Sequence, residues 1–456
     1  MSKNIDLTMG SISQKIFRFT MPILATSFIH MTYSFIDMIC IGRLGSPSVA
    51  AVGTAGFFLW FANASSAMAR IGTQVHVSQS YGKKDFSAVQ SYSEAAFWVN
   101  FLFGLLIAAI LSLGNQPIIA FFNLGSEFVI RQAREYLIIV ALSMPFMYVN
   151  PVLSAMLNSI GNSRSPFIAN SVGLIFNIVF DILLIFGVGP FPALGVHGAA
   201  IATASAQVVV FLMLLANNLK LDDSLRISIR KLPQLSFMKT ICKTGFPSAL
   251  QMTLYCCYSI VLARIIAQFG EVSIAVQKVG GQVESISWMT ADGLAIAVTA
   301  FIGQNFGIGN FKRIKKGIIV IASYAFLFGA MATVLLIFFG ENIFSIFLED
   351  RPSIEGGISY LRILGFSQIF MCFEILFVGV FNGHGETRIP ALMSILMTGS
   401  RIPIALLLSQ TPLGVDGVWW AISGTSIVKG ISIPLVFVLY RKHKMKSLMN
   451  NANISA

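Results

Sequence analysis

Charged residues are scarce in this sequence. Aspartate, glutamate, lysine and arginine make up 11% of its 456 residues, whereas 55% are hydrophobic. Because about a quarter of the residues in a typical soluble domain are charged, this composition excludes a soluble fold. Acidic residues are the rarer kind, with 19 against 31 basic residues and a net charge of +12.

Cysteines are few, and the motifs of enzymes are missing. The five cysteines form neither a disulfide framework nor a metal-ligand spacing: Cys40, Cys242, Cys256, Cys257 and Cys372. The chain contains no H-E-x-x-H, no G-x-S-x-G and no Walker A sequence. An intramembrane enzyme is therefore a remote alternative, no cofactor is expected, and the chain does not hydrolyse ATP itself.

Long apolar runs are what the sequence has in abundance. A helix needs about 20 mostly apolar residues to cross a bilayer, and a window of that length finds about twelve candidates. They leave only short connections. The sequence thus predicts an all-α membrane protein with twelve transmembrane helices, centred near Ser27, Ala62, Leu105, Pro145, Asn177, Val208, Thr253, Asp292, Met331, Met371, Ala405 and Gly430.

Basic residues gather in alternate loops rather than in one nucleic-acid-binding patch. They cluster at the N-terminus, at Lys83-Lys84, and in residues 220–243, 312–316 and 441–444, whereas the opposite loops are sparse or acidic. Cytoplasmic loops carry this excess of lysine and arginine. We therefore expect a multi-pass protein of a prokaryotic cytoplasmic (inner) membrane, with both termini in the cytoplasm and no nucleic-acid partner.

The two halves of the chain repeat each other. "SQSYGKKDF" answers "GQNFGIGNF", and Pro22, Tyr33 and Gly82 match Pro247, Tyr258 and Gly307 at a constant offset of 225. Two six-helix repeats of the same orientation are typical of transporters that work by alternating access. The expected organisation is an N-lobe (1–218), a cytoplasmic linker (219–240) and a C-lobe (241–456) around a central cleft.

Two aspartates lie within predicted N-lobe spans. Asp37 ends a polar stripe on the first span that includes Tyr33 and His30, and Asp181 follows Asn177 by one helical turn on the fifth. A charge in the bilayer is disfavoured by about 2.5–3.5 kcal/mol on insertion scales, so such residues are usually functional. The C-lobe has no aspartate at the two matching positions.

The repeat supplies the comparison. Leu262 stands in place of Asp37, Ala405 in place of Asp181 and Arg401 in place of Asn177. A carboxylate needed only for folding would be expected in both copies, which favours a function for the pair. The alternative is a buried ion pair with Arg70. As an ion site, the pair suits H⁺ or, with Asn177, Na⁺, and the residues leave both open.

The C-lobe has acids of its own. Glu284, Trp288 and Asp292 share a face of the eighth span, and Glu374 lies in the tenth. Acids beside an aromatic ring can hold an organic cation; pairing with Lys278, Arg264 or Arg401 is the equal alternative. Further substrate-binding candidates are His30, Asn150 and Ser154. No metal site is expected beyond the coupling ion.

Pro22 interrupts the first span fifteen residues before Asp37. Proline removes a helical hydrogen bond and permits bending. Pro22 is therefore a candidate hinge, with a static kink as the alternative.

Several phrases resemble the multidrug and toxic compound extrusion (MATE) family: "IDLTMGSISQKIFRFTMPIL", "GTQVHVSQSYGKKD", "QVESISWMTADGLAIAVTAFIGQNFGIGN" and "GVFNGHGETRIP". The likeness covers essentially the whole chain. It implies two six-helix lobes and export of organic cations against inward H⁺ or Na⁺.

The resemblance also implies which residues couple the ion. Asp37, Tyr33, Asn177 and Asp181 match the cation site of the archaeal and DinF-like branch, and Pro22 matches its first-helix proline. A threonine of the sixth span belongs to that network; Thr203 is nearest, with Ala199 the alternative alignment. The NorM-like branch carries C-lobe acids instead, and this chain has Tyr255 and Met371 there.

The sequence therefore predicts a secondary active multidrug efflux antiporter for lipophilic organic cations, such as drugs and dyes. Because one chain holds both lobes, we expect a monomer in contact with membrane lipid. The main rival is a flippase for a lipid-linked saccharide, which needs a cationic cavity and would use Arg70, Arg264 or Arg401.

Overall fold

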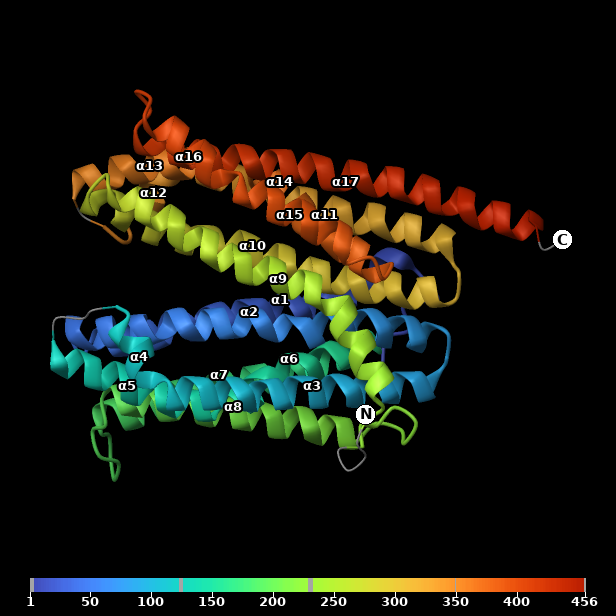
Figure 1. The fold of residues 1–456 in the computed structure, drawn as a ribbon, viewed down its shortest axis with the longest axis horizontal. Coiled ribbons are helices and arrows are strands. Elements are labelled where there is room, and N and C mark those ends of the chain that lie inside the picture. Colours follow the sequence, from blue (N-terminus) through green and yellow to red (C-terminus); the bar gives the residue numbers. More distant parts are fainter. Residues whose placement is uncertain (1–3, 123–125, 229–232, 349, 455–456) are drawn as a thin grey trace. The chain divides into compact units, whose positions relative to one another are not determined.

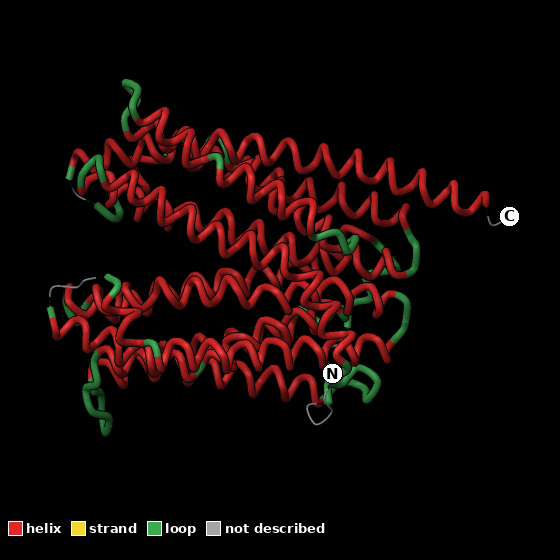
Figure 2. The backbone as a smooth tube through the Cα atoms, viewed as in Figure 1, coloured by secondary structure: helices red, strands yellow, loops and turns green. Residues whose placement is uncertain are grey.

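The computed structural model of the chain describes residues 4–122, 126–228, 233–348 and 350–454, with side chains for all of these but Ser34, Ser46 and 443–454. Residues 229–232 of the predicted linker lie outside the described residues. The described chain is helical and contains no strand (Figure 2). The helices are α1 (Ile12–Gly42), α2 (Ser46–Gly82), α3 (Phe86–Leu113), α4 (Asn115–Ala120), α5 (Glu127–Leu142), α6 (Met144–Ser159), α7 (Arg164–Phe186), α8 (Val196–Leu219), α9 (Leu235–Ala267), α10 (Glu271–Gly307), α11 (Phe311–Phe338), α12 (Gly340–Phe344), α13 (Arg351–Gly365), α14 (Gln368–Gly383), α15 (Arg388–Gly399), α16 (Arg401–Ser409) and α17 (Val415–Ile454) (Figure 1).

The helix bounds repeat as the sequence predicted. Helices α2 and α10 are each 37 residues long and begin 225 residues apart, at Ser46 and Glu271. Helices α3 and α11 are each 28 residues long and keep the same offset. Helices α7 and α15 begin 224 residues apart, at Arg164 and Arg388. The two halves therefore share one architecture.

Twelve spans are confirmed when bent helices are counted as single spans. Among the described residues, 10 segments are long and apolar enough to cross a membrane, one of them made of α15 and α16 together. Two more spans are pairs that bend, by 46° between α5 and α6 and by 50° between α13 and α14. These bends lie at equivalent places in the two halves, so they belong to the repeated fold.

The structure divides into two compact units. Unit 1 contains Met1–Thr253 and Ala300–Ile314, and unit 2 contains Leu254–Thr299 and Lys315–Ala456. The units follow the predicted lobes except that α9, α10 and the first residues of α11 are divided between the two. The lobe and linker boundaries given above stay a prediction.

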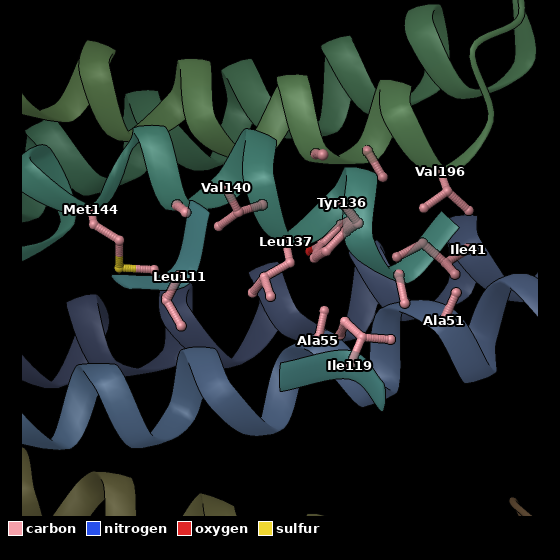
Figure 3. Close-up of a cluster of buried hydrophobic side chains, with 14 of the residues drawn as sticks. Ile41, Ala51, Ala55, Leu111, Ile119, Tyr136, Leu137, Val140, Met144 and Val196 are labelled. Carbon is pink, nitrogen blue, oxygen red and sulfur yellow. The ribbon is translucent and has the colours of Figure 1, made fainter. Parts of the chain in front are cut away.

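The core of unit 1 surrounds α5. Its residues Leu137 and Val140 belong to one buried cluster that also includes Ala55 of α2, Ile119 of α4 and Val196 of α8 (Figure 3). Small residues are frequent among the buried ones of this cluster, which lets the helix backbones approach closely. This packing fixes α5, α7 and α8 around the end of α1.

In unit 2 the largest buried side chain is Trp419 of α17. Its ring meets the Tyr360 ring of α13 edge to face, with centroids 4.8 Å apart. Phe344 and Leu361 complete the cluster.

Glycines join α2 to the end of α10 within unit 1. A Cβ atom at Gly82 would overlap the carbonyl oxygen of Gln304, and one at Gly307 would overlap that of Gln79. The two contacts are related by the repeat. This close crossing explains why the phrases around Gly82 and Gly307 are so similar.

The N-terminal segment is tied to the same end of unit 1. The Ile5 amide donates to the Gly161 carbonyl oxygen at 3.0 Å. The Arg313 guanidinium donates to three carbonyl oxygens of the segment, those of Leu7, Met9 and Gly10. The N-terminus, Arg313 and the turn after α2 thus lie at one end of the unit.

Candidate functional site

The N-lobe candidates come together on α1, α7 and α8. Asn177 and Asp181 are fully buried on α7, where they are one turn apart. Helix α1 packs along α7, and Asp37 lies near enough to Asp181 for the two charges to interact. The structure therefore forms one cluster from residues that are about 140 positions apart in sequence.

The polar atoms of this cluster lack hydrogen bonds. Within the described residues, no partner is found for the enclosed Oδ1 of Asp37, both carboxylate oxygens of Asp181 or the Asn177 amide. The Tyr33 and Thr203 hydroxyls interact with each other but do not reach hydrogen-bonding geometry. Buried polar groups are normally satisfied, so these orphaned oxygens indicate a site for an additional positive charge.

Two members of the cluster were uncertain or missed at the sequence level. The contact with Tyr33 favours Thr203 over Ala199, which is instead packed among apolar side chains. Tyr136 of α5 also lies beside Asp37, Asp181 and Thr203, and the sequence analysis missed it. Its match with Tyr360 in the repeat was the available signal.

Neither aspartate forms an ion pair with a basic residue in the described part of the chain. The ion pairs found among the described residues do not include Arg70 with either carboxylate. The ion-pair alternative therefore has no support from the geometry. The oxygen atoms of Asp37, Asn177 and Asp181, with two hydroxyls, are the donors that a proton or a hard cation such as Na⁺ uses.

Helix α1 runs through Pro22 without ending. The missing amide leaves the Arg18 carbonyl oxygen without its helical partner, and Thr26 donates to the Pro22 carbonyl oxygen at 2.9 Å. Tyr33 and Asp37 lie on the part of α1 that follows the proline. Pro22 as a hinge stays a prediction.

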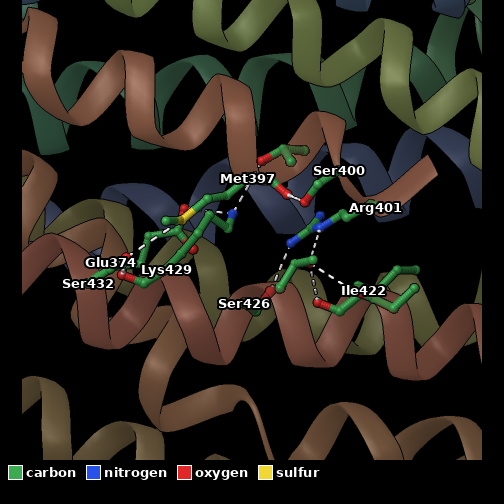
Figure 4. Close-up of polar contacts among 11 residues, drawn as sticks. Glu374, Met397, Ser400, Arg401, Ile422, Ser426, Lys429 and Ser432 are labelled. Carbon is green, nitrogen blue, oxygen red and sulfur yellow. Dashed lines mark hydrogen bonds and ion pairs between the residues drawn. The ribbon is translucent and has the colours of Figure 1, made fainter. Parts of the chain in front are cut away.

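The acids of the C-lobe have partners that differ from those considered. Lys429 Nζ of α17 lies 2.7 Å from a carboxylate oxygen of Glu374, and both side chains are buried (Figure 4). Glu374 is therefore ion-paired, as one of the two alternatives expected, but its partner is Lys429 rather than Lys278, Arg264 or Arg401, because α14 packs on α17. The pair is a structural ion pair of α14 and α17.

Glu284 forms no ion pair within the described part of the chain. It accepts a hydrogen bond from Gln368 Nε2 at 3.4 Å and interacts with the Tyr360 hydroxyl. Trp288 is 47% exposed on α10, and Asp292 is half-buried. The three residues share a helix face as predicted. The hydrogen-bonding partners of Glu284 are neutral groups, and Arg401, one of the partners considered, lies within its electrostatic reach.

Arg401 begins α16, just after the break at Ser400. Its Nε donates to Thr425 Oγ1 and its Nη2 to Ser426 Oγ, both at 2.8 Å (Figure 4). The guanidinium is buried, with 6% of the residue exposed.

The remaining substrate-binding candidates are dispersed. Asn150 of α6 donates to the backbone and side-chain oxygens of Gln207 on α8, which is a helix-packing contact. Ser154 is half-buried and His30 is exposed. The five cysteines are free, and no cluster of three metal-ligating side chains occurs among the described residues.

A duplicated twelve-span bundle with a buried, uncompensated acid cluster defines a membrane transporter. The MatE family model matches residues 22–183 and 247–407, one segment in each half. The chain therefore belongs to the MatE family and is a transporter, not an enzyme, as the sequence predicted.

Relatives that match nearly the whole chain are named as multidrug resistance proteins or transporters. The chain is 26% identical over 453 residues to a probable multidrug resistance protein NorM of Thermotoga maritima, covering 97% of this chain and 96% of that one. It is 27% identical to the probable multidrug resistance protein YoeA of Bacillus subtilis, covering 93% and 92%. It is also 23% identical to an FAD transporter of Shewanella oneidensis, covering 93% and 94%.

Solved structures share the fold. A MOP superfamily transporter of Pyrococcus furiosus superposes with a TM-score of 0.89 at 22% identity, covering 98% of this chain and 99% of that one. An outward-facing multidrug resistance MATE family transporter gives a TM-score of 0.88 at 22% identity, covering 98% and 99%.

Proposed function

We propose that this transporter is a secondary active antiporter that exports lipophilic organic cations in exchange for inward H⁺ or Na⁺ by alternating access. The observation that carries the proposal is the N-lobe cluster, in which the buried Asp181 and the half-buried Asp37 have enclosed oxygens without hydrogen bonds and form no ion pair with a basic residue among the described residues. The names of the NorM and YoeA relatives support multidrug export.

In the proposed cycle, an ion binds at Asp37 and Asp181 and neutralises them. Neutral carboxyls no longer attract a cationic substrate, so the drug leaves. Loss of the ion restores the negative charge, which attracts the next cation. Bending of α1 at Pro22 is the proposed link, since Tyr33 and Asp37 both follow the proline on that helix.

The proposed setting is the cytoplasmic membrane, with both termini in the cytoplasm. The N-terminal segment and Arg313 lie at the same end of unit 1 as the Lys83-Lys84 turn. Basic residues at one end support this orientation. A fluorescent protein fused to the C-terminus should fold and fluoresce inside the cell; exclusively external reporter activity would reverse the assignment.

The test is ethidium efflux from proteoliposomes under an imposed pH gradient or an imposed Na⁺ gradient. We expect one gradient to drive efflux in the wild type and neither to do so in Asp37→Asn or Asp181→Asn. The matched control is Asp223→Asn, whose side chain is 99% exposed. Full gradient-driven efflux by Asp37→Asn would refute the proposal.

The flippase alternative makes a different prediction. Folded wild-type protein would then move ethidium under neither gradient and would translocate a fluorescent lipid-linked saccharide instead. Of the arginines that such a cargo would use, Arg401 is buried in unit 2 and Arg264 is exposed on α9.

A further inference from the structure

Arg401 is a charged residue well inside a membrane span. The span runs from Arg388 to Ser409, and Arg401 directly follows Ser400, where α15 joins α16. Helical hydrogen bonds continue across this junction, from the Ser400 amide to the Leu396 carbonyl oxygen at 3.0 Å and from the Ile404 amide to the Ser400 carbonyl oxygen at 3.2 Å. The equivalent helix of the N-lobe, α7, is continuous and carries Asn177 at the matching position.

The guanidinium has only neutral partners. Thr425 and Ser426 accept from Nε and Nη2, and no carboxylate lies within 4.0 Å of Arg401 among the described residues. No hydrogen bond of the third nitrogen, Nη1, is found in the described chain. A guanidinium has five donors and binds a carboxylate or phosphate through two parallel hydrogen bonds. Arg401 has no such partner among the described residues.

The acids of the lobe are held elsewhere. Glu374 is paired with Lys429, and Glu284 is bound to Gln368 and Tyr360. Glu284 lies close enough to Arg401 for their charges to attract each other, but it forms no hydrogen bond with the guanidinium. Arg401 is therefore partly balanced in charge by Glu284 without forming an ion pair within the described residues.

Two tyrosines of α9 lie near this part of the span. A Cβ atom at Gly399 would lie 3.2 Å from the Tyr258 hydroxyl, so this phenol lies beside the junction of α15 and α16. Tyr255 is within electrostatic reach of Arg401 and is 46% exposed. An exposed side chain of unit 2 is therefore a neighbour of the buried guanidinium.

We infer that Arg401 is a binding point for a carboxylate or phosphate group of an amphipathic ligand. Arg401 thus gives the C-lobe a buried charge opposite in sign to that of the N-lobe acids. That the ligand is transported cargo rests on the function proposed above; that the site binds an oxyanion does not. The same chemistry is offered by a zwitterionic drug and by an anionic lipid headgroup.

The test compares two dyes that differ only in a free carboxylate: rhodamine B and its ethyl ester. Equilibrium binding to the full chain in phosphatidylcholine nanodiscs is followed by fluorescence anisotropy, with empty nanodiscs as the blank. Arg401→Gln should weaken rhodamine B binding by between about tenfold and a hundredfold, the usual weight of a charged hydrogen bond, and leave the ester unchanged.

Two further variants guard against a folding defect. Arg401→Lys keeps the charge and should retain part of the rhodamine B affinity, whereas Arg264→Gln removes an exposed arginine of the same lobe and should change nothing. Nanodiscs that contain phosphatidylcholine and phosphatidylglycerol in equal amounts distinguish a drug ligand from a lipid ligand. If phosphatidylglycerol headgroups occupy the Arg401 site, these nanodiscs weaken rhodamine B binding to the wild type but not to Arg401→Gln. The change in binding of the ethyl ester is subtracted in each case.

Equal losses for both dyes, or no loss for either, would overturn the inference. Because no ion gradient is imposed, a failure of ion coupling leaves this result unaffected. Conversely, coupled ethidium efflux with no selective rhodamine B effect would leave the antiporter standing and remove the oxyanion site.

Discussion

The N-lobe and the C-lobe share their helices but differ in their buried charges. At matching positions the N-lobe has Asp181 and Asn177, and the C-lobe has Ala405 and Arg401. Helix α6 is joined to α8 by the Asn150–Gln207 amide contact, whereas the matching α14 is joined to α17 by the Glu374–Lys429 ion pair. The two lobes therefore have the same arrangement of helices but different buried polar and charged residues.

This difference separates two kinds of residue. Gly82 and Gly307, which recur at the constant offset, are residues on which helix packing depends. Those present in one copy carry the properties that distinguish the lobes. Variants can therefore be chosen to disturb either the helix packing that both lobes share or the buried charges that only one lobe has.

The largest expected effect comes from moving the carboxylate between lobes. Asp181→Ala should abolish ion-coupled ethidium efflux, and adding Ala405→Asp should not restore it, because the C-lobe has Leu262 at the position that matches Asp37. In the C-lobe the new acid would lie one turn from Arg401 and pair with it. Efflux under an imposed gradient is the measurement. Recovery of coupling in the double variant would show that the lobes are interchangeable.

Breaking the C-lobe ion pair should cost stability rather than coupling. Lys429→Met leaves Glu374 buried without its partner, which costs about 3–5 kcal/mol when such a pair is broken. Glu374→Gln combined with Lys429→Met removes both charges and should recover most of this loss.

Thermal unfolding of the purified variants measures the difference. In the N-lobe, Asn150→Leu removes a neutral amide contact and should cost only about 1 kcal/mol. If Lys429→Met is no less stable than Asn150→Leu, the ion pair is not what joins α14 to α17.

The glycine crossing tests the shared scaffold. Gly307→Val places a side chain on the Gln79 carbonyl oxygen, and Gly82→Val on that of Gln304. Overpacking of this kind costs about 1–3 kcal/mol, and the two variants should be affected alike. Gly53→Ala is the control on α2, since nothing lies within 4 Å of an added Cβ there. A large loss for Gly53→Ala would indicate that helix propensity, not the crossing, decides the result.

Much of the fold was predictable because lipid and repetition leave strong signals. Apolar run length predicted the spans, and the offset between Pro22 and Pro247 predicted the equivalent helices. The breaks were not predicted: the α5/α6 and α13/α14 bends leave the apolar pattern uninterrupted.

The candidate site was predictable where a helical face or the repeat pointed to it. Asp37, Asn177 and Asp181 stand out as polar groups in apolar helices. The partner of Glu374 did not stand out, because which helix packs on α14 depends on tertiary contacts and not on spacing. Tyr136 was missed for the same reason, although its match with Tyr360 was visible.

The smallest expected effect concerns the caps of α3 and α11. Asp85 accepts from the Ala88 amide at 3.0 Å, and Asn310, its match in the repeat, accepts from the Arg313 amide at 3.1 Å. Since either side chain can satisfy a free amide at a helix start, Asp85→Asn should be nearly neutral, whereas Asp85→Ala and Asn310→Ala should each cost about 1 kcal/mol. Thermal unfolding again provides the measurement. The caps belong to the shared scaffold only if both alanine variants lose a similar amount; a loss confined to Asp85→Ala would make this cap, too, a feature of one lobe.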